Sequence, residues 1–214
     1  MIIQHYDTYD ADFSRHYDHY AAWLEKINGL NIVRVNSQTG KDYFSFEQNK
    51  SLIDLAAKFS EEQGIEVLHE THRNKFSFAA HITRQYLTAI PYLKIVLDAS
   101  HWVNVSESFL EDQQEAMQWA IARTEHIHAR VGFPEGPQIS DPRAPEWKEA
   151  LDVHLRWWDQ VIERKRKENA PVFTILPEFG PSPYMPVLPY TRQPVASQWE
   201  INLFMMKLLK ERYA

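Results

Sequence analysis

The sequence predicts an α/β fold built on a parallel sheet, and three observations support it. Short apolar runs of strand length alternate with longer amphipathic runs along all 214 residues. Each strand with its following helix takes about thirty residues, a spacing typical of right-handed βαβ crossovers. Hydrophobic residues make up 44% of the chain and no Ser/Gly-rich linker interrupts it. We therefore expect a single α/β domain over residues 1–214.

Six segments rich in Ile, Val, Leu and Phe have the length and composition of strands, and the first of them is the weakest. They are residues 2–6, 31–37, 65–72, 93–101, 124–131 and 171–179. Apolar residues at helical spacing predict helices between and after them, one of which ends at Gly64. These helices are expected over residues 14–28, 48–63, 107–122, 145–168 and 196–212.

Two irregular stretches follow predicted strands. Residues 132–146 are rich in Pro and Gly, and residues 177–195 contain six prolines. Sites in α/β proteins lie at the carboxyl ends of parallel strands, on loops of this kind. The Phe, Tyr and Met residues in these stretches favour pocket walls, although variable surface loops would have a similar composition.

An ionisable residue stands where each of the last four apolar runs stops. These residues are Glu70, Asp98, His128 and Glu178. A single carboxylate after a strand is often a helix cap, and a single strand histidine is often a buried polar residue. Four in register would converge around the axis of a barrel, where three carboxylates repel one another unless a cation joins them. Three oxygen ligands with one imidazole suit Mn²⁺, Mg²⁺ or Co²⁺.

Several neighbouring residues are candidates for binding substrate or for orienting the four ligands. They are His101 and Trp102 after Asp98, His72 and Arg73 after Glu70, and His126 and Arg130 on either side of His128.

Composition excludes several classes of function. The formal net charge is −6, which disfavours a protein that grips nucleic acid, and there is no cysteine for disulfides or thiolate zinc sites. No Gly-rich phosphate loop, GxSxG elbow or HExxH motif is present. No apolar run reaches the roughly 18 residues of a membrane span, and the N-terminus lacks the pattern of a signal peptide. We expect no nucleic-acid or membrane partner and a cytoplasmic location.

As a set, Glu70, the DxxH run from Asp98 to His101, the HxH run ending at His128, and Glu178 resemble the xylose-isomerase-like TIM-barrel superfamily. That superfamily includes sugar and sugar phosphate isomerases and epimerases and the apurinic-site endonucleases. The resemblance implies a TIM-barrel-like parallel (β/α) barrel in which the four strand-end residues bind one divalent metal. It also implies that Glu70 and Glu178 exchange the substrate proton and that His101 contacts substrate. We expect Mn²⁺, with Mg²⁺, Co²⁺ and Zn²⁺ as alternatives.

The sequence departs from the pattern of the ketohexose 3-epimerases at two positions and at its N-terminus. Phe76 and Phe133 stand where those enzymes carry a glutamate and an arginine, so the resemblance does not reach ketohexose specificity. In the superfamily the first glutamate ends the fifth strand. The chain is therefore expected to lack the first two βα units and to have about six of the eight strands of a full barrel.

We therefore expect a metal-dependent isomerase or epimerase of a sugar or related polyhydroxy carbonyl compound, acting by proton transfer through an enediolate. Two alternatives stay open: a non-catalytic or degenerate carbohydrate-binding barrel, and an apurinic-endonuclease-type metal hydrolase, which the net charge disfavours. An incomplete barrel exposes strand edges that invite pairing with another chain. We expect a homodimer in which residues 1–30 lie near the contact.

Overall fold

A single parallel sheet organises the computed structural model, which describes residues 1–6 and 8–214. Its six strands lie in chain order, and every neighbouring pair is parallel. The strands are β1 (Ile2–His5), β2 (Arg34–Ser37), β3 (Glu66–Glu70), β4 (Ile95–Leu97), β5 (Thr124–His128) and β6 (Thr174–Leu176). The predicted parallel α/β architecture is confirmed.

The sheet curls into an open barrel. Side chains of the first two and last two strands line one cavity of about 290 Å³, which a flat sheet would not allow. Across the barrel interior, Arg34 on β2 donates to the backbone oxygen of Glu125 on β5 at 2.7 Å. Within the described residues, no ladder joins β1 to β6, so the barrel stays open between these two strands.

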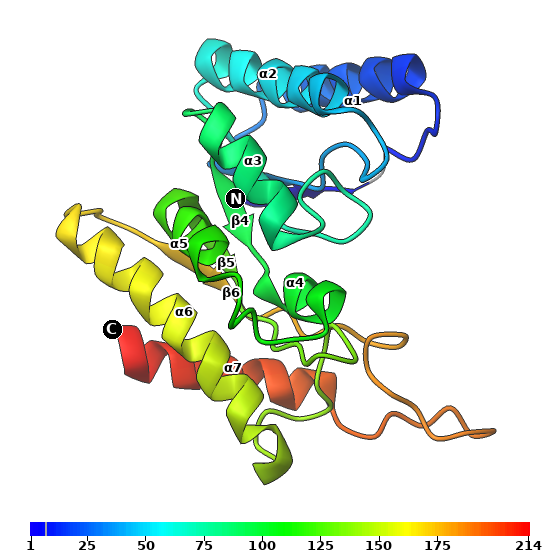
Figure 1. Ribbon diagram of the computed structural model, residues 1–214, viewed down its shortest axis with the longest axis vertical. Helices are drawn as coiled ribbons and strands as arrows, with labels where there is room; N and C mark the ends of the chain where they lie inside the picture. Colours follow the sequence, from blue (N-terminus) through cyan, green and yellow to red (C-terminus); the bar gives the residue numbers. More distant parts are fainter. Residues whose placement is uncertain (7) are drawn as a thin grey trace.

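Helices cover the outside of the sheet (Figure 1). They are α1 (Phe13–Ile27), α2 (Phe46–Gln63), α3 (Ala80–Ala89), α4 (Ala99–Ser106), α5 (Gln114–Arg123), α6 (Lys148–Lys167) and α7 (Gln198–Tyr213), with a single 3₁₀ turn, η1, at Pro145–Trp147. None of these described helices is both long and apolar enough to cross a membrane.

Helix α2 links two apolar cores. Leu52 and Phe59 pack with α1 and the first strands, whereas Ile53 packs into the larger core around β4, β5 and the later helices. A capping box between Ser45 and Gln48 starts this helix, and Gly64 ends it at φ +68°. These local signals are why its predicted bounds, 48–63, agree closely with the structure.

Two helices follow loops where the sequence predicts none. Helix α3 has several β-branched residues and no side-chain cap at Ala79, so its start signal is weak. Helix α4 begins inside the predicted strand 93–101, because Asp98 caps it directly after a strand of only three residues. The predicted helix 107–122 begins only at Gln114, since Glu107 and Leu110 have φ values of +48° and +59°.

The other predicted strands are longer than the observed ones. The segments 65–72, 124–131 and 171–179 end as strands at Glu70, His128 and Leu176. Pro177 has no backbone N–H to continue the ladder beyond β6. The irregular stretches 132–146 and 177–195 contain mostly turns and isolated bridges, as predicted.

A candidate metal centre at the carboxyl ends of the strands

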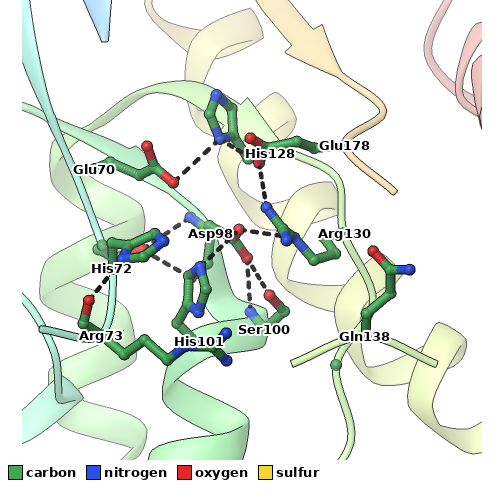
Figure 2. A network of polar contacts seen from close by, with 12 residues as sticks. Glu70, His72, Arg73, Asp98, Ser100, His101, His128, Arg130, Gln138 and Glu178 are labelled. Carbon is green, nitrogen blue, oxygen red and sulfur yellow. Dashed lines mark hydrogen bonds and ion pairs between the residues drawn. The ribbon is translucent and has the colours of Figure 1, made fainter. Parts of the chain in front are cut away.

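The four strand-end residues come from four neighbouring strands. Glu70 is the last residue of β3, Asp98 follows β4, His128 is the last residue of β5, and Glu178 stands two residues after β6. The register aligns these positions, since Glu70 pairs with Val96 and His128 with Leu176. Figure 2 shows the four side chains turned toward a common centre.

Each of the four offers one ligand atom, and these atoms all lie within 4.8 Å of one another. Nδ1 of His128 lies 2.5 Å from Oε2 of Glu178 and 3.5 Å from Oε1 of Glu70. In spite of these short distances, all three atoms are buried without a hydrogen bond. Atoms that converge on one point, rather than along a donor–acceptor line, are arranged as ligands of a cation are.

In two of the carboxylates, one oxygen accepts hydrogen bonds and the other oxygen accepts none. Asn36 and Gln38 donate to Oε2 of Glu70 at 2.8 and 3.3 Å. The backbone N–H and hydroxyl of Ser100 donate to Oδ1 of Asp98. The second oxygen of each carboxylate has no hydrogen-bond donor. Outer hydrogen bonds of this kind orient carboxylates that bind metals.

Asp98 therefore caps helix α4 and faces the centre with the same side chain. Asp98 can be both a helix cap and a metal ligand, because the two roles use different oxygens.

Glu178 lies on a loop, and two side-chain amides hold that loop in place. Gln138 accepts from the backbone N–H of Gly180 at 2.7 Å and donates to its carbonyl at 3.2 Å. Asn202 on α7 makes the same paired contacts with Phe179, at 3.0 and 2.9 Å. The two irregular stretches and α7 together fix the position of Glu178.

Burial and mutual charge shift the pKa values at this centre. Burial raises the pKa of Asp98 to about 7, although Arg130 opposes it. Burial acts to raise the pKa of Glu70, but the charge on His128 outweighs it and holds that pKa well below its usual range. Burial acts to lower the pKa of His128, but Glu70 and Glu178 outweigh it and raise that pKa to about 10.

These residues fit one divalent cation. With a neutral imidazole, three carboxylates and the guanidinium of Arg130 sum to −2, which a divalent cation would balance. Without a cation, the proton on His128 serves as the local positive charge, as its raised pKa indicates. Carboxylate oxygens with one imidazole suit Mn²⁺, Mg²⁺, Co²⁺ or Zn²⁺.

Two histidines and an arginine border the centre on one side. The rings of His72 and His101 contact each other, with centroids 4.0 Å apart. Both imidazole nitrogens of His101 are buried without a hydrogen bond, and burial lowers its pKa well below the usual value. His72, His101 and Glu70 form a second group of converging ligand atoms. Arg73 follows His72, and its guanidinium lies 5.3 Å from the ring centroid of Tyr184.

The remaining predicted contacts lie at different depths. Arg130 reaches the centre, with Nε 3.3 Å from Oδ2 of Asp98 and Nη2 3.0 Å from Oε2 of Glu178. His126 lies deeper in the barrel, where its ring bonds the hydroxyl of Thr174 at 2.7 Å. Trp102 is buried in the apolar core, and its indole N–H donates to the carbonyl of Ser77 at 2.8 Å. Trp102 thus supports the loop after β3 from the core.

Sequence reasoning missed the residues that orient this site. They are Asn36, Gln38, Ser100, Gln138, Tyr184 and Asn202. Asn36 had a usable signal, because it stands near the carboxyl end of a strand, as the four candidate ligands do. Tyr184 lies in the proline-rich stretch, with its ring 4.2 Å from the guanidinium of Arg130.

Two solved structures share this fold. The probable 3-DHS dehydratase AsbF of Bacillus anthracis, involved in petrobactin synthesis, aligns with a TM-score of 0.53 at 19% identity over 98% of this chain and 74% of its own. The IolI protein, solved with a bound zinc atom, aligns with a TM-score of 0.55 at 13% identity over 100% of this chain and 76% of its own. The chain therefore has the fold of a TIM-barrel-like parallel (β/α) barrel, left open between β1 and β6.

No protein-family model matches the chain, and no curated protein matches it. At these identities the structural likeness establishes the fold and the strand order. The chemistry has to be argued from the side chains of this chain.

Proposed function

We propose that this protein is a metal-dependent enzyme that isomerises or epimerises a sugar or related polyhydroxy carbonyl compound. The observation that carries the proposal is the set of four buried ligand atoms, from Glu70, Asp98, His128 and Glu178, that converge without hydrogen bonds. A divalent cation held by these four would polarise a substrate carbonyl and acidify the neighbouring C–H.

The two glutamates are the proton carriers in this proposal. One carboxylate removes the proton next to the carbonyl to give an enediolate, and the other carboxyl group returns a proton. Glu70 and Glu178 approach the same atom, Nδ1 of His128, at 3.5 and 2.5 Å. Amide donors hold Glu70, and the loop clamps hold Glu178, so both start from fixed positions.

The histidine pair beside the centre has the chemistry to bind substrate hydroxyls. His72 and His101 lie in contact next to Glu70, and burial lowers the pKa of each, so both are neutral near pH 7. A neutral imidazole donates through one nitrogen and accepts through the other. The free nitrogens of His101 would meet substrate oxygen atoms.

A dehydratase is a second candidate, because the solved structure of a probable dehydratase has this fold. Elimination of water next to a carbonyl begins with the same C–H proton transfer, so the same glutamates would serve it. The two reactions differ in whether the substrate keeps its hydroxyl groups.

Two further alternatives remain from the sequence. A degenerate carbohydrate-binding barrel would bind metal and sugar without C–H exchange. An apurinic-endonuclease-type hydrolase would bind abasic duplex DNA with steep salt dependence, which a net charge of −6 disfavours.

The test is C–H exchange in deuterated water. The full chain with Mn²⁺ is incubated with a panel of ketoses, sugar phosphates and sugar acids, and deuterium uptake is followed by NMR. We expect uptake next to the carbonyl of at least one compound, abolished by a chelator. A product that has lost water relative to its substrate would identify the reaction as a dehydration. Metal binding without exchange on any compound would overturn the proposal in favour of a binding protein.

A further inference from the structure

Two buried lysines lie on neighbouring loops beside the candidate metal centre. Lys41 is in the loop after β2 and Lys75 is in the loop after β3, and they are 7% and 5% exposed. The loops are joined to each other, because the backbone N–H of Phe76 donates to the carbonyl of Thr39 and the ammonium of Lys41 to the amide oxygen of Asn74.

Among residues 1–6 and 8–214, neither ammonium group has a carboxylate partner. Within residues 1–6 and 8–214, the side-chain contacts of Lys41 are the amide oxygen of Asn74 at 3.4 Å and the ring of Tyr9, 6.0 Å from its centroid. No hydrogen bond or ion pair of the Lys75 ammonium occurs in that same part of the chain. Other lysines, such as Lys94 with Glu66 at 2.7 Å, do have carboxylate partners.

The two charges also act on each other. Burial and the charge of Lys41 lower the pKa of Lys75 to about 8, and Glu70 and Asp42 oppose this only in part. Two buried like charges without a counter-ion are unfavourable. The stems of both lysines are largely buried. The Lys75 ammonium is not among the fully buried unpaired atoms of the described residues, so an anion from solvent could reach it. An anion from outside the chain would supply the missing charge.

The position of the pair connects it to the reaction. Both loops lie at the carboxyl ends of the strands, at the edge where the metal centre forms. Lys75 is close enough to Glu70 for that carboxylate to act on its pKa. Arg73, on the same loop, likewise has no ion pair within the described residues, and its guanidinium faces Tyr184. Three basic side chains, Lys41, Arg73 and Lys75, thus stand on these two loops without an ion pair among the described residues.

We propose that Lys41 and Lys75 form an anion-binding site that holds the phosphate or carboxylate group of the substrate. This inference rests on the proposed function and narrows it to anionic polyhydroxy carbonyl compounds, that is, sugar phosphates or sugar acids. Two ammonium groups offer up to six N–H donors, and one anion between them offsets their repulsion. The anionic end of the substrate would lie at the lysines while its carbonyl lies between Glu70 and Glu178.

Anion binding to the metal-free full chain tests the site without any turnover. Titration calorimetry uses inorganic phosphate in one arm and glycolate in the other. The chain is kept free of metal because a bound metal would itself bind these anions. We expect at least one of them to bind, and the stronger of the two assigns the phosphate or the carboxylate class. Lys41→Met and Lys75→Met keep the apolar stem, and each is expected to weaken binding roughly tenfold or more.

Two controls make the result decisive. Lys58→Met removes an exposed lysine that pairs with Glu62, and it should leave anion affinity unchanged. Lys75→Arg keeps the charge and should retain most of the binding, which separates loss of charge from misfolding. The proposal is overturned if neither anion binds the wild-type chain, or if folded Lys41→Met and Lys75→Met bind as well as wild type.

The proposed function can fail separately. Asp98→Ala should lose metal while keeping anion affinity, because Asp98 is not part of the lysine site. Anion binding that depends on the two lysines, in a protein without C–H exchange, would leave the anion site standing and remove the isomerase. C–H exchange that depends on Glu70 and Glu178, in a protein without lysine-dependent anion binding, would support the isomerase and remove the anion site.

Discussion

The strand ends of the two halves of the sheet are built differently. After β1 and β2, polar side chains form a chain of hydrogen bonds in which each described member has a partner, here named the closed network. His5 bonds Thr8 and Ser37 at 2.8 and 3.1 Å, and Ser37 bonds Thr39, which bonds His69 at 2.7 Å. After β3 to β6, ionisable groups face one another, and several of their buried atoms have no hydrogen bond.

This difference separates polar residues that stabilise the fold from polar residues that await a ligand. Buried polar groups in native proteins are normally paired, as the described members of the closed network are. Unpaired buried atoms gathered at one point need a partner from outside the chain. Burial and polarity alone do not distinguish the closed network from the four candidate ligands; their hydrogen bonds do.

The largest expected effect concerns the proposed proton carriers. Glu70→Gln and Glu178→Gln keep a neutral oxygen near the centre but remove the acid–base group, so C–H exchange should fall by roughly 10²- to 10⁴-fold. Deuterium uptake followed by NMR measures this. The matched control is Glu61→Gln on the exposed face of α2, which should leave exchange unchanged. Normal exchange in both active-site variants would remove the acid–base assignment.

The four candidate ligands at the strand ends could be predicted from the sequence better than the residues that orient them. Glu70, Asp98, His128 and Glu178 could be found because each directly interrupts an apolar run, which is a local signal. Asn36, Gln138 and Asn202 act on partners 34, 42 and 23 positions away, so no local pattern marks them. Helix α3 was missed for a related reason, since it has no side-chain cap and packs into the larger core. Helix α4 was missed because its cap, Asp98, directly follows a strand.

The second prediction compares two candidate ligands with one residue of the closed network. Asp98→Ala and His128→Ala should weaken Mn²⁺ binding by more than the roughly 10- to 100-fold typical of outer-sphere changes. Ser37→Ala, in the closed network, should leave Mn²⁺ affinity unchanged and instead cost about 1–3 kcal/mol of stability. Calorimetric titration and thermal unfolding of all three variants give both quantities. Equal metal affinity in the Asp98 and His128 variants and wild type would erase the distinction between the halves.

The third prediction is a pH dependence of the metal-free protein. The pKa of His128 is raised from 6.5 to about 10 by Glu70 and Glu178, against the effect of burial. A raised histidine pKa stabilises the fold below pH 6.5, and this contribution, on the order of 5 kcal/mol for the full shift, is lost as the pH rises toward 10. Lys75, whose burial lowers its pKa to about 8, has the opposite sign in the same range.

The measurement is therefore a difference between two proteins. The free energy of unfolding of wild type minus that of His128→Gln should fall between pH 7 and pH 10, which cancels the contribution of Lys75. Saturating Mn²⁺ should abolish the fall, because a metal ligand is a neutral imidazole. A difference that stays flat without metal would mean that His128 is not protonated in the metal-free centre.

The last prediction, with the smallest expected effect on the site, concerns the opening between β1 and β6. We expect two chains to associate there. Among the described residues, β1 pairs only with β2 and β6 only with β5, so each has a free edge. Apolar side chains of both strands line the cavity between them, and Ile2 is 38% exposed. Free edges next to apolar surface favour pairing with another chain. A homodimer with residues 1–30 near the contact is our expectation; Asp7 of that segment lies outside the described residues.

Light scattering on dilute protein should therefore give twice the 25.3 kDa of one chain. Ile2→Lys places a charge on the free edge of β1 and should shift the protein toward monomer. Val105→Lys changes a residue of nearly equal exposure, 39%, on helix α4, away from both edges, and should leave the mass unchanged. A wild-type mass near 25 kDa would show that the open barrel is stable as a single chain. The closed network after β1 and β2 would then be sufficient to hold the N-terminal half in place without a second copy.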